Sequence, residues 1–224
     1  MYANCFKRVL DFLLSLCALT VLSPLLLALT VIGAIAMKGN PFFTQLRPGK
    51  DERIFKLIKF RTMTCETDAD GKPLPDEQRL TAYGKFLRAS SLDELPELFN
   101  ILIGDMSIVG PRPQLVRDMV FMTPEQRLRH TVRQGLTGLA QVNGRNNMTW
   151  EQKLTYDLQY IENITLIEDV KIILKTVGKV FRQDGINEEG NATAEDFGDY
   201  LLRKGAVNRE EYLAKQQEAE ALLR

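Results

Sequence analysis

The pattern of apolar and polar positions separates an uncharged amino-terminal segment from a longer part in which short periods alternate. From Phe12 to Met37 no charged residue occurs over 26 positions. A straight helix of that length would reach roughly 39 Å at ~1.5 Å per residue, which exceeds the ~30 Å hydrocarbon core of a bilayer. The run is longer than that of a secretory signal and shows no small-residue cleavage site. It predicts a retained membrane helix within residues 1–40.

Ser23 and Pro24 lie in the middle of this run. Proline removes a backbone donor and clashes with the carbonyl of Thr20, while the Ser23 hydroxyl can return a hydrogen bond to the preceding turn. A spanning helix usually has its excess of basic residues on one side, whereas here both flanks are basic, at Lys7, Arg8, Lys38, Arg47 and Lys50. Two arrangements fit: a re-entrant helix that is broken at Ser23-Pro24 and leaves by the face it entered, and a kinked single-pass anchor.

Beyond residue 40 the sequence shows short strand and helix periods. Residues 42–46 and 54–60 are β-prone and are separated by turn residues, which predicts a β-hairpin within residues 42–63. Residues 64–78 are polar with glycine and prolines, so we expect a surface loop. Helical periods follow at 80–88, 92–103, 113–121, 124–133, 149–161 and 166–183.

These elements predict an α+β protein that is mainly α with a small β-hairpin. We expect three parts: the membrane helix over 1–40, which is re-entrant in one of its two possible arrangements, a compact cytosolic domain over 41–186, and a charged helical tail over 187–224. The helix-prone run of the tail begins at Arg209.

Composition narrows the possible functions. Lysine plus arginine and aspartate plus glutamate both total 29, so the net charge indicates no polyanionic partner such as a nucleic acid. The three cysteines have no metal-ligand spacing and suggest no disulfide framework, so we expect reduced thiols and a cytosolic catalytic domain. No P-loop or Gly-x-Gly-x-x-Gly pattern is present, which argues against an ATPase or a dinucleotide enzyme.

An acidic pair, Asp93-Glu94, carries the first candidate chemistry. In one interpretation it is structural, because Ser91-x-x-Glu94 fits a capping box and acids in a first helical turn suit the helix dipole. In the other interpretation the pair is catalytic. Neighbouring residues on a helix point about 100° apart, so one carboxylate could attack phosphorus or hold a metal while the other handles a proton. The pair alone does not decide between them.

Basic residues around the pair favour phosphate chemistry. Arg112 lies between Pro111 and Pro113, which restrict the backbone and present its side chain at little entropic cost. Phosphoryl transfer needs cations around the developing equatorial charge, and arginine suits bidentate contact. Each cation alone is more often a surface residue or an ion-pair partner, so the argument rests on the set: Lys59, Arg61, Arg88, Arg112 and Arg145.

Five ordered motifs together resemble the bacterial sugar transferase family, the monotopic polyprenol-phosphate phosphoglycosyl transferases. They are Lys59-Phe60-Arg61-Thr62-Met63, Ser91-Leu92-Asp93-Glu94-Leu95-Pro96, Gly104-Asp105-Met106-Ser107, Val109-Gly110-Pro111-Arg112-Pro113 and Gln141-Val142-Asn143-Gly144-Arg145. The resemblance covers roughly residues 4–186. Within the family the chain most resembles members that prime N-linked glycan assembly with N,N′-diacetylbacillosamine phosphate.

The resemblance implies a reaction and a set of roles. A UDP-sugar would donate its sugar 1-phosphate to undecaprenyl phosphate and release UMP, through a covalent phospho-sugar intermediate on Asp93. Mg²⁺ would bind at Asp93, and Glu94 would assist on the metal or on the incoming lipid phosphate. Lys59, Arg88, Arg112 and Arg145 would bind phosphates, and Asp157 also matches the family, as a possible active-site residue beside Arg61. The break at Ser23-Pro24 matches the family's re-entrant helix.

The resemblance also implies a location and partners: the cytoplasmic face of the bacterial inner membrane, membrane lipids and other enzymes of a glycan pathway. Two alternatives stay open. The same chemistry could use UDP-linked galactose, glucose or an N-acetylhexosamine for polysaccharide or O-antigen initiation. From another class, the chain could be a non-catalytic membrane-anchored interaction protein.

Overall fold

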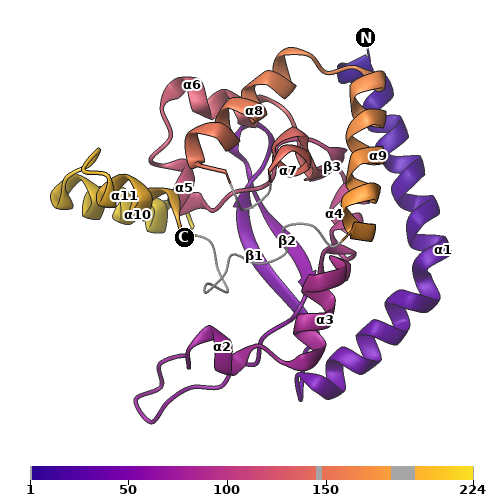
Figure 1. The fold of residues 1–224 in the computed structure, drawn as a ribbon, viewed down its shortest axis with the longest axis horizontal. Coiled ribbons are helices and arrows are strands. Elements are labelled where there is room, and N and C mark those ends of the chain that lie inside the picture. Colours follow the sequence, from indigo (N-terminus) through magenta and orange to yellow (C-terminus); the bar gives the residue numbers. More distant parts are fainter. Residues whose placement is uncertain (1, 145–147, 183–194, 224) are drawn as a thin grey trace.

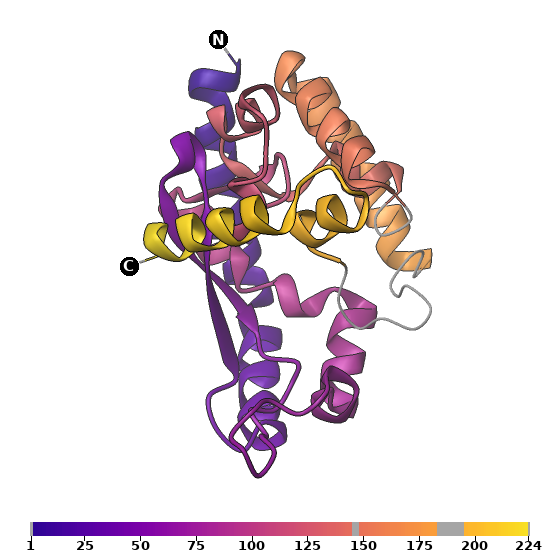
Figure 2. The same ribbon diagram turned by 90° about the vertical axis from the view of Figure 1, so that its left-hand side faces the viewer.

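The computed structural model describes residues 2–144, 148–182 and 195–223. A long β-hairpin lies at the centre, helix α1 (Lys7–Ala36) runs along one side of it, and α10 (Phe197–Arg203) and α11 (Arg209–Leu222) lie on the opposite side (Figure 1). Figure 2 shows α11 crossing in front of the hairpin with α1 behind it. The predicted class, mainly α with small β elements and one long apolar amino-terminal helix, is confirmed.

Helix α1 is the one described helix that is long and apolar enough to cross a membrane. It is preceded by a short π-helix, η1 (Tyr2–Phe6), and changes direction along its length without a gap in the helix (Figure 1). Pro24 deprives the carbonyl of Thr20 of its usual donor, and the Ser23 hydroxyl donates to that carbonyl over 2.8 Å. The predicted return bond is therefore confirmed, whereas an interruption of the helix at Ser23-Pro24 is not seen.

One face of α1 packs against the rest of the protein along most of its length. Its buried residues recur at helical spacing and are Asp11, Ser15, Leu19, Leu29 and Gly33. Only 17% of its most apolar 18-residue stretch is buried, so most of its apolar side chains face away from the protein. Such a helix has one face that needs protein contact and another that needs an apolar solvent.

Polar contacts attach both ends of α1 to the rest of the fold. Near its start, Arg8 donates to the carbonyls of Ile101 and Leu102, and the Asp11 carboxylate accepts from the Ser107 hydroxyl over 2.7 Å. Near its end, the carbonyl of Leu29 accepts from Tyr83 over 2.8 Å. Lys7, the other basic residue of the amino-terminal flank, pairs with Asp169. These two basic residues are thus committed to protein contacts as well as flanking the apolar run.

The predicted hairpin is confirmed as β1 (Phe42–Pro48) and β2 (Ile54–Phe60), paired antiparallel and joined by η2 (Lys50–Glu52). Its apolar side chains Phe55, Leu57 and Phe60 are buried. Phe55 and Leu57 belong to a core cluster with Leu19 of α1, and this packing holds the hairpin against the membrane helix.

Several helices agree with the sequence periods: α3 (Ala82–Ser90), α8 (Trp150–Glu162) and α9 (Leu166–Arg182). The predicted helix over 92–103 is wrong in part, because it is divided into η3 (Leu92–Glu94) and α4 (Glu97–Ile103) around Pro96. The period at 113–121 yields only α5 (Val116–Met119), and that at 124–133 yields α6 (Pro124–Arg127) with η4 (Leu128–Thr131). The remaining short helices are α2 (Asp76–Arg79) and α7 (Leu139–Asn143).

A second small sheet was not predicted. Strands β3 (Met106–Val109) and β4 (Gln134–Thr137) pair in parallel. Strand β4 contains Gly135 and is mostly buried. Gly110 and Gly135 lie so close in this region that a Cβ on Gly135 would come within 2.1 Å of the Gly110 nitrogen. The two glycines permit the close backbone approach.

The predicted helix from Arg209 is confirmed as α11. It is not a detached tail, because Phe197, Tyr200 and Ala219 are buried in one cluster with Val116 and Met119 of α5. Part of the predicted tail, residues 187–194, lies outside the described residues.

Candidate active site

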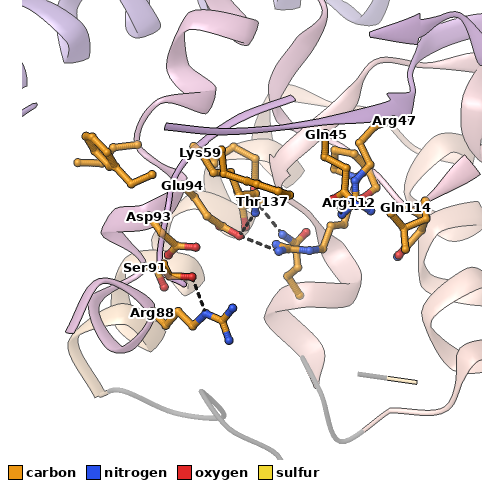
Figure 3. A pocket seen from close by; sticks show the side chains of 18 of the residues that line it. Gln45, Arg47, Lys59, Arg88, Ser91, Asp93, Glu94, Arg112, Gln114 and Thr137 are labelled. Carbon is orange, nitrogen blue, oxygen red and sulfur yellow. Dashed lines mark hydrogen bonds and ion pairs between the residues drawn. The ribbon is translucent and has the colours of Figure 1, made fainter. Parts of the chain in front are cut away.

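A cavity of about 1020 Å³ opens between β2, η3, β4, α8, α9 and the segments before α5 and α10. It is lined by most of the residues singled out from the sequence, namely Lys59, Arg61, Arg88, Asp93, Glu94, Arg112 and Asp157. Arg145 lies outside the described residues, so its predicted phosphate contact stays a prediction. Figure 3 shows the central members of this set converging from different elements.

The turn at Ser91 sets the direction of the acidic pair. Ser91 has a left-handed backbone, with φ of 56°, that ends α3 and begins η3. Its side chain makes no capping hydrogen bond at η3, and the Glu94 side chain turns to two cations instead. The capping-box interpretation of Ser91 and Glu94 is therefore wrong.

Glu94 is held by a cation on each side. Its Oε1 accepts from Lys59 Nζ at 2.9 Å and from Arg112 Nη2 at 2.7 Å. Lys59 also pairs with Glu97 at 3.0 Å. Burial alone would raise the pKa of Glu94, but Arg112 and Lys59 outweigh it and lower that pKa. Glu94 is therefore a fixed anion in this structure.

Asp93 has a different environment although it is the adjacent residue. Among the described residues, none donates a hydrogen bond or forms an ion pair with its carboxylate. Burial, followed by the charge of Glu94, raises the pKa of Asp93 to about 6, against the opposing effect of Lys59 and Arg112. The pair thus contains one carboxylate locked by cations and one available carboxylate, and perturbation of this kind is frequent at functional sites.

The backbone around Arg112 is fixed by hydrogen bonds to three successive carbonyls. The Pro111 carbonyl accepts from the backbone nitrogen of Gly135 at 2.8 Å, the Arg112 carbonyl from Arg129 at 2.6 Å, and the Pro113 carbonyl from Arg47 at 3.2 Å. The prolines that suggested a rigid presentation of Arg112 therefore act together with tertiary contacts.

Asp157 acts through this same segment. Its Oδ2 accepts from Nε of the fully buried Arg129 at 2.9 Å, and Arg129 in turn holds the Arg112 carbonyl. The structure therefore places Asp157 behind Arg112, as a positioning residue, and not against Asp93. This contact gives Asp157 a physical role, which could not be assigned from the sequence.

Two further predicted cations lie at the edges of the site. Arg88, in the last turn of α3, donates from Nε to the Thr62 hydroxyl at 3.2 Å, and its charge opposes the raised pKa of Asp93. Arg61 donates to Cys65 Sγ at 3.0 Å and to the Phe42 carbonyl at 3.2 Å, so it lines the cavity without contacting the acidic pair.

The donor set fits a magnesium ion that is completed by a ligand. No group of three or more metal-binding side chains occurs in the described part of the chain. Mg²⁺ typically takes one or two protein carboxylates together with waters and substrate phosphates, and the available oxygens of Asp93 meet that requirement. A site in which protein side chains alone hold the metal would need more ligands than these residues supply.

Glu97 and Gln114 were not predicted from the sequence to belong to the site, and Arg47 was considered only as a basic residue that flanks the apolar run. Glu97 is buried and shares Lys59 with Glu94; burial raises the pKa of Glu97 to about 7, against Lys59. Helix α4 begins at Glu97 after the break at Pro96, so no helical spacing from Asp93 marks this residue. Arg47 and Gln114 line the cavity beyond Arg112, and nothing local in the sequence marks them.

The chain is similar in sequence to several known sugar transferases. The family model for bacterial sugar transferases matches residues 2–183. EpsL of Bacillus subtilis, named an uncharacterized sugar transferase, is 43% identical over 85% of this chain and 95% of its own length. The UDP-glucose:undecaprenyl-phosphate glucose-1-phosphate transferase of Klebsiella pneumoniae is 41% identical over 79% of this chain. The undecaprenyl-phosphate galactose phosphotransferase of Salmonella typhimurium is 35% identical over 80% of it. The matches span 40% and 41% of those two longer proteins.

Proposed function

Because this chain belongs to the bacterial sugar transferase family, we propose that it transfers a sugar 1-phosphate from a UDP-sugar to undecaprenyl phosphate and releases UMP. The observation that carries the mechanism is the contrast within the acidic pair: Glu94 is locked between Lys59 and Arg112, whereas the Asp93 carboxylate is available. The proposed reaction proceeds through a covalent intermediate on Asp93.

In the first step an Asp93 oxygen attacks the sugar-bearing phosphorus. An acyl-phosphate bond forms, the bond from that phosphorus to the bridging oxygen breaks, and the electron pair leaves with UMP. Arg112, Lys59 and Arg88 offset charge on the phosphoryl oxygens, as phosphoryl transfer requires. An anionic Asp93 is needed for attack, and its pKa of about 6 leaves it mostly ionised at neutral pH.

In the second step a phosphate oxygen of undecaprenyl phosphate attacks the phospho-enzyme. A new diphosphate bond forms, the acyl-phosphate bond breaks, and the Asp93 carboxylate is restored. Glu94 keeps Lys59 and Arg112 in place through both steps because it contacts both. These residues support a two-step exchange in which UMP leaves before the lipid reacts.

Mg²⁺ is the proposed cofactor. Asp93 would hold it together with the substrate diphosphate, and the ion would add positive charge where the phosphates are bound. Arg145 remains a proposed phosphate ligand.

The proposed sugar is N,N′-diacetylbacillosamine, from the resemblance of the motifs. Glucose is the second candidate, because the Klebsiella relative that matches 79% of the chain is named for UDP-glucose. The sugar decides whether the product starts an N-linked glycan or a polysaccharide, and with which pathway enzymes the protein acts.

We further propose that the protein is monotopic, with its catalytic domain on the cytoplasmic face of the bacterial inner membrane. Both ends of α1 contact the same domain, through Asp11 near its start and Leu29 near its end. A helix that spanned a bilayer would carry one end away from that domain. The neighbouring helix α9, which Lys7 joins through Asp169, exposes an apolar stripe made of Ile167, Val170, Leu174 and Val177. Such a face suits the membrane interface.

The experiment that tests the mechanism is UMP release without lipid acceptor. Purified protein with Mg²⁺ is mixed with each of a panel of UDP-sugars, beside Asp93→Asn. We expect the wild type to release about one UMP per enzyme, as for a covalent intermediate that accumulates, with sugar phosphate on the peptide that contains Asp93. The variant should release none, and the sugar that gives the burst identifies the substrate.

Other results would contradict the proposal in different ways. Release that begins only when undecaprenyl phosphate is added would mean direct transfer. No release from any UDP-sugar, with or without lipid, would favour a membrane-anchored interaction protein.

A further inference from the structure

The cavity continues past Arg112 to a second arginine. Gln45, Arg47 and Gln114 line this part, and Figure 3 shows them on the far side of Arg112 from Asp93. Arg47 extends from β1 and donates from Nη1 to the Pro113 carbonyl at 3.2 Å and from Nη2 to Gln45 Oε1 at 2.7 Å.

The guanidinium of Arg47 has a donor that no described residue uses. In the ranges that the structure describes, Arg47 forms no ion pair, and its buried Nε has no hydrogen-bond partner. Burial, together with the charge of Arg112, lowers the pKa of Arg47 to about 10, against the opposing effect of Asp118, Glu97 and Asp196. Among the described residues, Arg112 contacts one carboxylate, that of Glu94. Two guanidinium groups therefore share one wall of the cavity and repel each other, and a bound anion would offset this repulsion and supply a partner for Arg47 Nε.

We propose that Arg47, together with Arg112, binds the phosphate of the nucleoside monophosphate that leaves in the first step. This inference rests on the proposed function. It assigns the two sides of Arg112 to different phosphates: the transferred phosphate lies toward Asp93, and the departing phosphate lies toward Arg47.

The chemistry of the step explains why a second arginine belongs there. Before the step, the nucleotide phosphate is singly charged, with an ester bond to the nucleoside and an anhydride bond to the transferred phosphate. When the bond from the transferred phosphorus to the bridging oxygen breaks, the nucleotide phosphate becomes a monoester and gains one negative charge. In-line displacement places the leaving oxygen opposite the attacking carboxylate, and Arg47 lies across the cavity from Asp93. A guanidinium with an unused N–H is suited to that added charge.

The carboxyl-terminal helices bound the region beyond Arg47. Asp118 accepts from the backbone nitrogens of Leu115 and Phe197 at 3.0 and 2.9 Å, which joins the start of α5 to α10. Asp196, beside this junction, lines the cavity. The nucleoside attached to the departing phosphate would therefore lie against a wall built partly by residues after 183, beyond the family match.

Binding of UMP tests the site without any transfer reaction. Calorimetry would compare the wild type, Arg47→Gln and Arg53→Gln, a matched control because Arg53 is exposed in the turn of the same hairpin. Loss of one charge-assisted contact should weaken UMP binding by about tenfold or more, while Arg53→Gln binds like the wild type. Uridine, which lacks the phosphate, should bind the wild type and Arg47→Gln equally. Equal UMP affinity in all three proteins would overturn the inference.

Kinetics separate nucleotide binding from a purely structural role of Arg47 at the Pro113 carbonyl. For nucleotide binding, Arg47→Gln should raise KM for the UDP-sugar and weaken inhibition by UMP. The rate at which preformed phospho-enzyme reacts with undecaprenyl phosphate should stay unchanged, because UMP has already left. An equal loss in that second step would mean that Arg112 has moved, and would overturn the inference. Wild-type protein that binds UMP through Arg47 but releases none from any UDP-sugar would refute the proposed function and leave the site standing.

Discussion

Asp93 and Glu94 are adjacent in sequence and opposite in electrostatic behaviour. Glu94 accepts from Lys59 and Arg112, whereas no described residue donates to Asp93. The left-handed turn at Ser91 and the 3-10 helix after it direct the two side chains into these different surroundings. A nucleophile and the anion that organises its cations can therefore be neighbours in the chain.

The raised pKa of Asp93 predicts a stability cost. The folded pKa of about 6 lies above the ordinary aspartate value, so the ionised form destabilises the fold above pH 6, and the cost disappears as the pH falls toward the ordinary value. In EDTA at pH 8, Asp93→Asn should therefore be more stable than the wild type by on the order of 1 kcal/mol. Thermal unfolding in detergent at pH 8 and pH 5 measures this, and the difference should shrink at pH 5.

Glu94→Gln is the control for that measurement. Because the pKa of Glu94 is lowered in the fold, its ionised form stabilises the protein above the ordinary glutamate value. The control should be less stable than the wild type at pH 8. Equal stabilities of the wild type and Asp93→Asn at pH 8 would show that the ionised Asp93 carboxylate does not destabilise the fold.

At the scale of elements, the site is assembled by contacts between segments that are distant in sequence. The segment 111–113 is fixed by Gly135 of β4, by Arg129 of η4 and by Arg47 of β1. Asp157 of α8 in turn fixes Arg129. The position of Arg112 therefore depends on four elements besides its own loop.

Asp157→Asn should reduce both stability and activity. Removing one partner of a buried ion pair typically costs about 3–5 kcal/mol, because the other charge stays buried. Arg129 is fully buried, so the loss should be of this order in unfolding experiments. The kcat for transfer should also fall, because Arg129 holds the Arg112 carbonyl.

A paired substitution separates the two effects. Replacing both residues, in Arg129→Met with Asp157→Leu, removes both buried charges and should recover much of the stability. It should not recover kcat, since no donor then holds the Arg112 carbonyl. Full recovery of kcat by the double variant would refute the positioning role of Asp157.

At the scale of the whole molecule, the membrane helix is part of the fold. The stripe of α1 that faces the domain runs from Asp11 to Gly33, and the half-buried Leu22 and Leu26 continue it past Pro24. The opposite face is apolar and exposed, with Val21 at 69% and Ile35 at 74% exposure. The proposed reaction joins a soluble UDP-sugar to a lipid-bound acceptor, so its site should lie at the membrane surface, and this arrangement supports that location.

Labelling of the native cysteines should decide the topology. Cys5 precedes α1, Cys65 follows the hairpin, and both are exposed. In single-cysteine variants, a membrane-impermeant maleimide should react with both positions in inverted inner-membrane vesicles and with neither in spheroplasts. Reaction of Cys5 only in spheroplasts, with Cys65 reacting only in inverted vesicles, would mean a single-pass helix. Retained transfer activity of each variant is the control.

Much of the fold and of the chemistry was predictable because it is encoded locally. Three signals depend only on residues that are close in sequence: the uncharged run of 26 residues, the pair of β-prone segments around a turn, and the helical periods. The acidic pair and the cations Lys59, Arg88 and Arg112 were identified from residue type and presentation. Errors came where local signals were ambiguous: Pro96 divides a predicted helix, and β4 is a short glycine-containing strand that pairs only with a distant partner.

By itself, the sequence determined the apolar anchor, the hairpin, the main helices and the candidate residues for phosphate chemistry, since these depend on side-chain type and short spacing. Only the tertiary structure decided which carboxylate is available and which is locked, that Asp157 acts through Arg129, and that Arg47 joins Arg112 in one cavity. The physical reason is that burial and charge at these positions come from residues brought together over long sequence separations, such as Asp157 and Arg129 or Arg47 and Pro113.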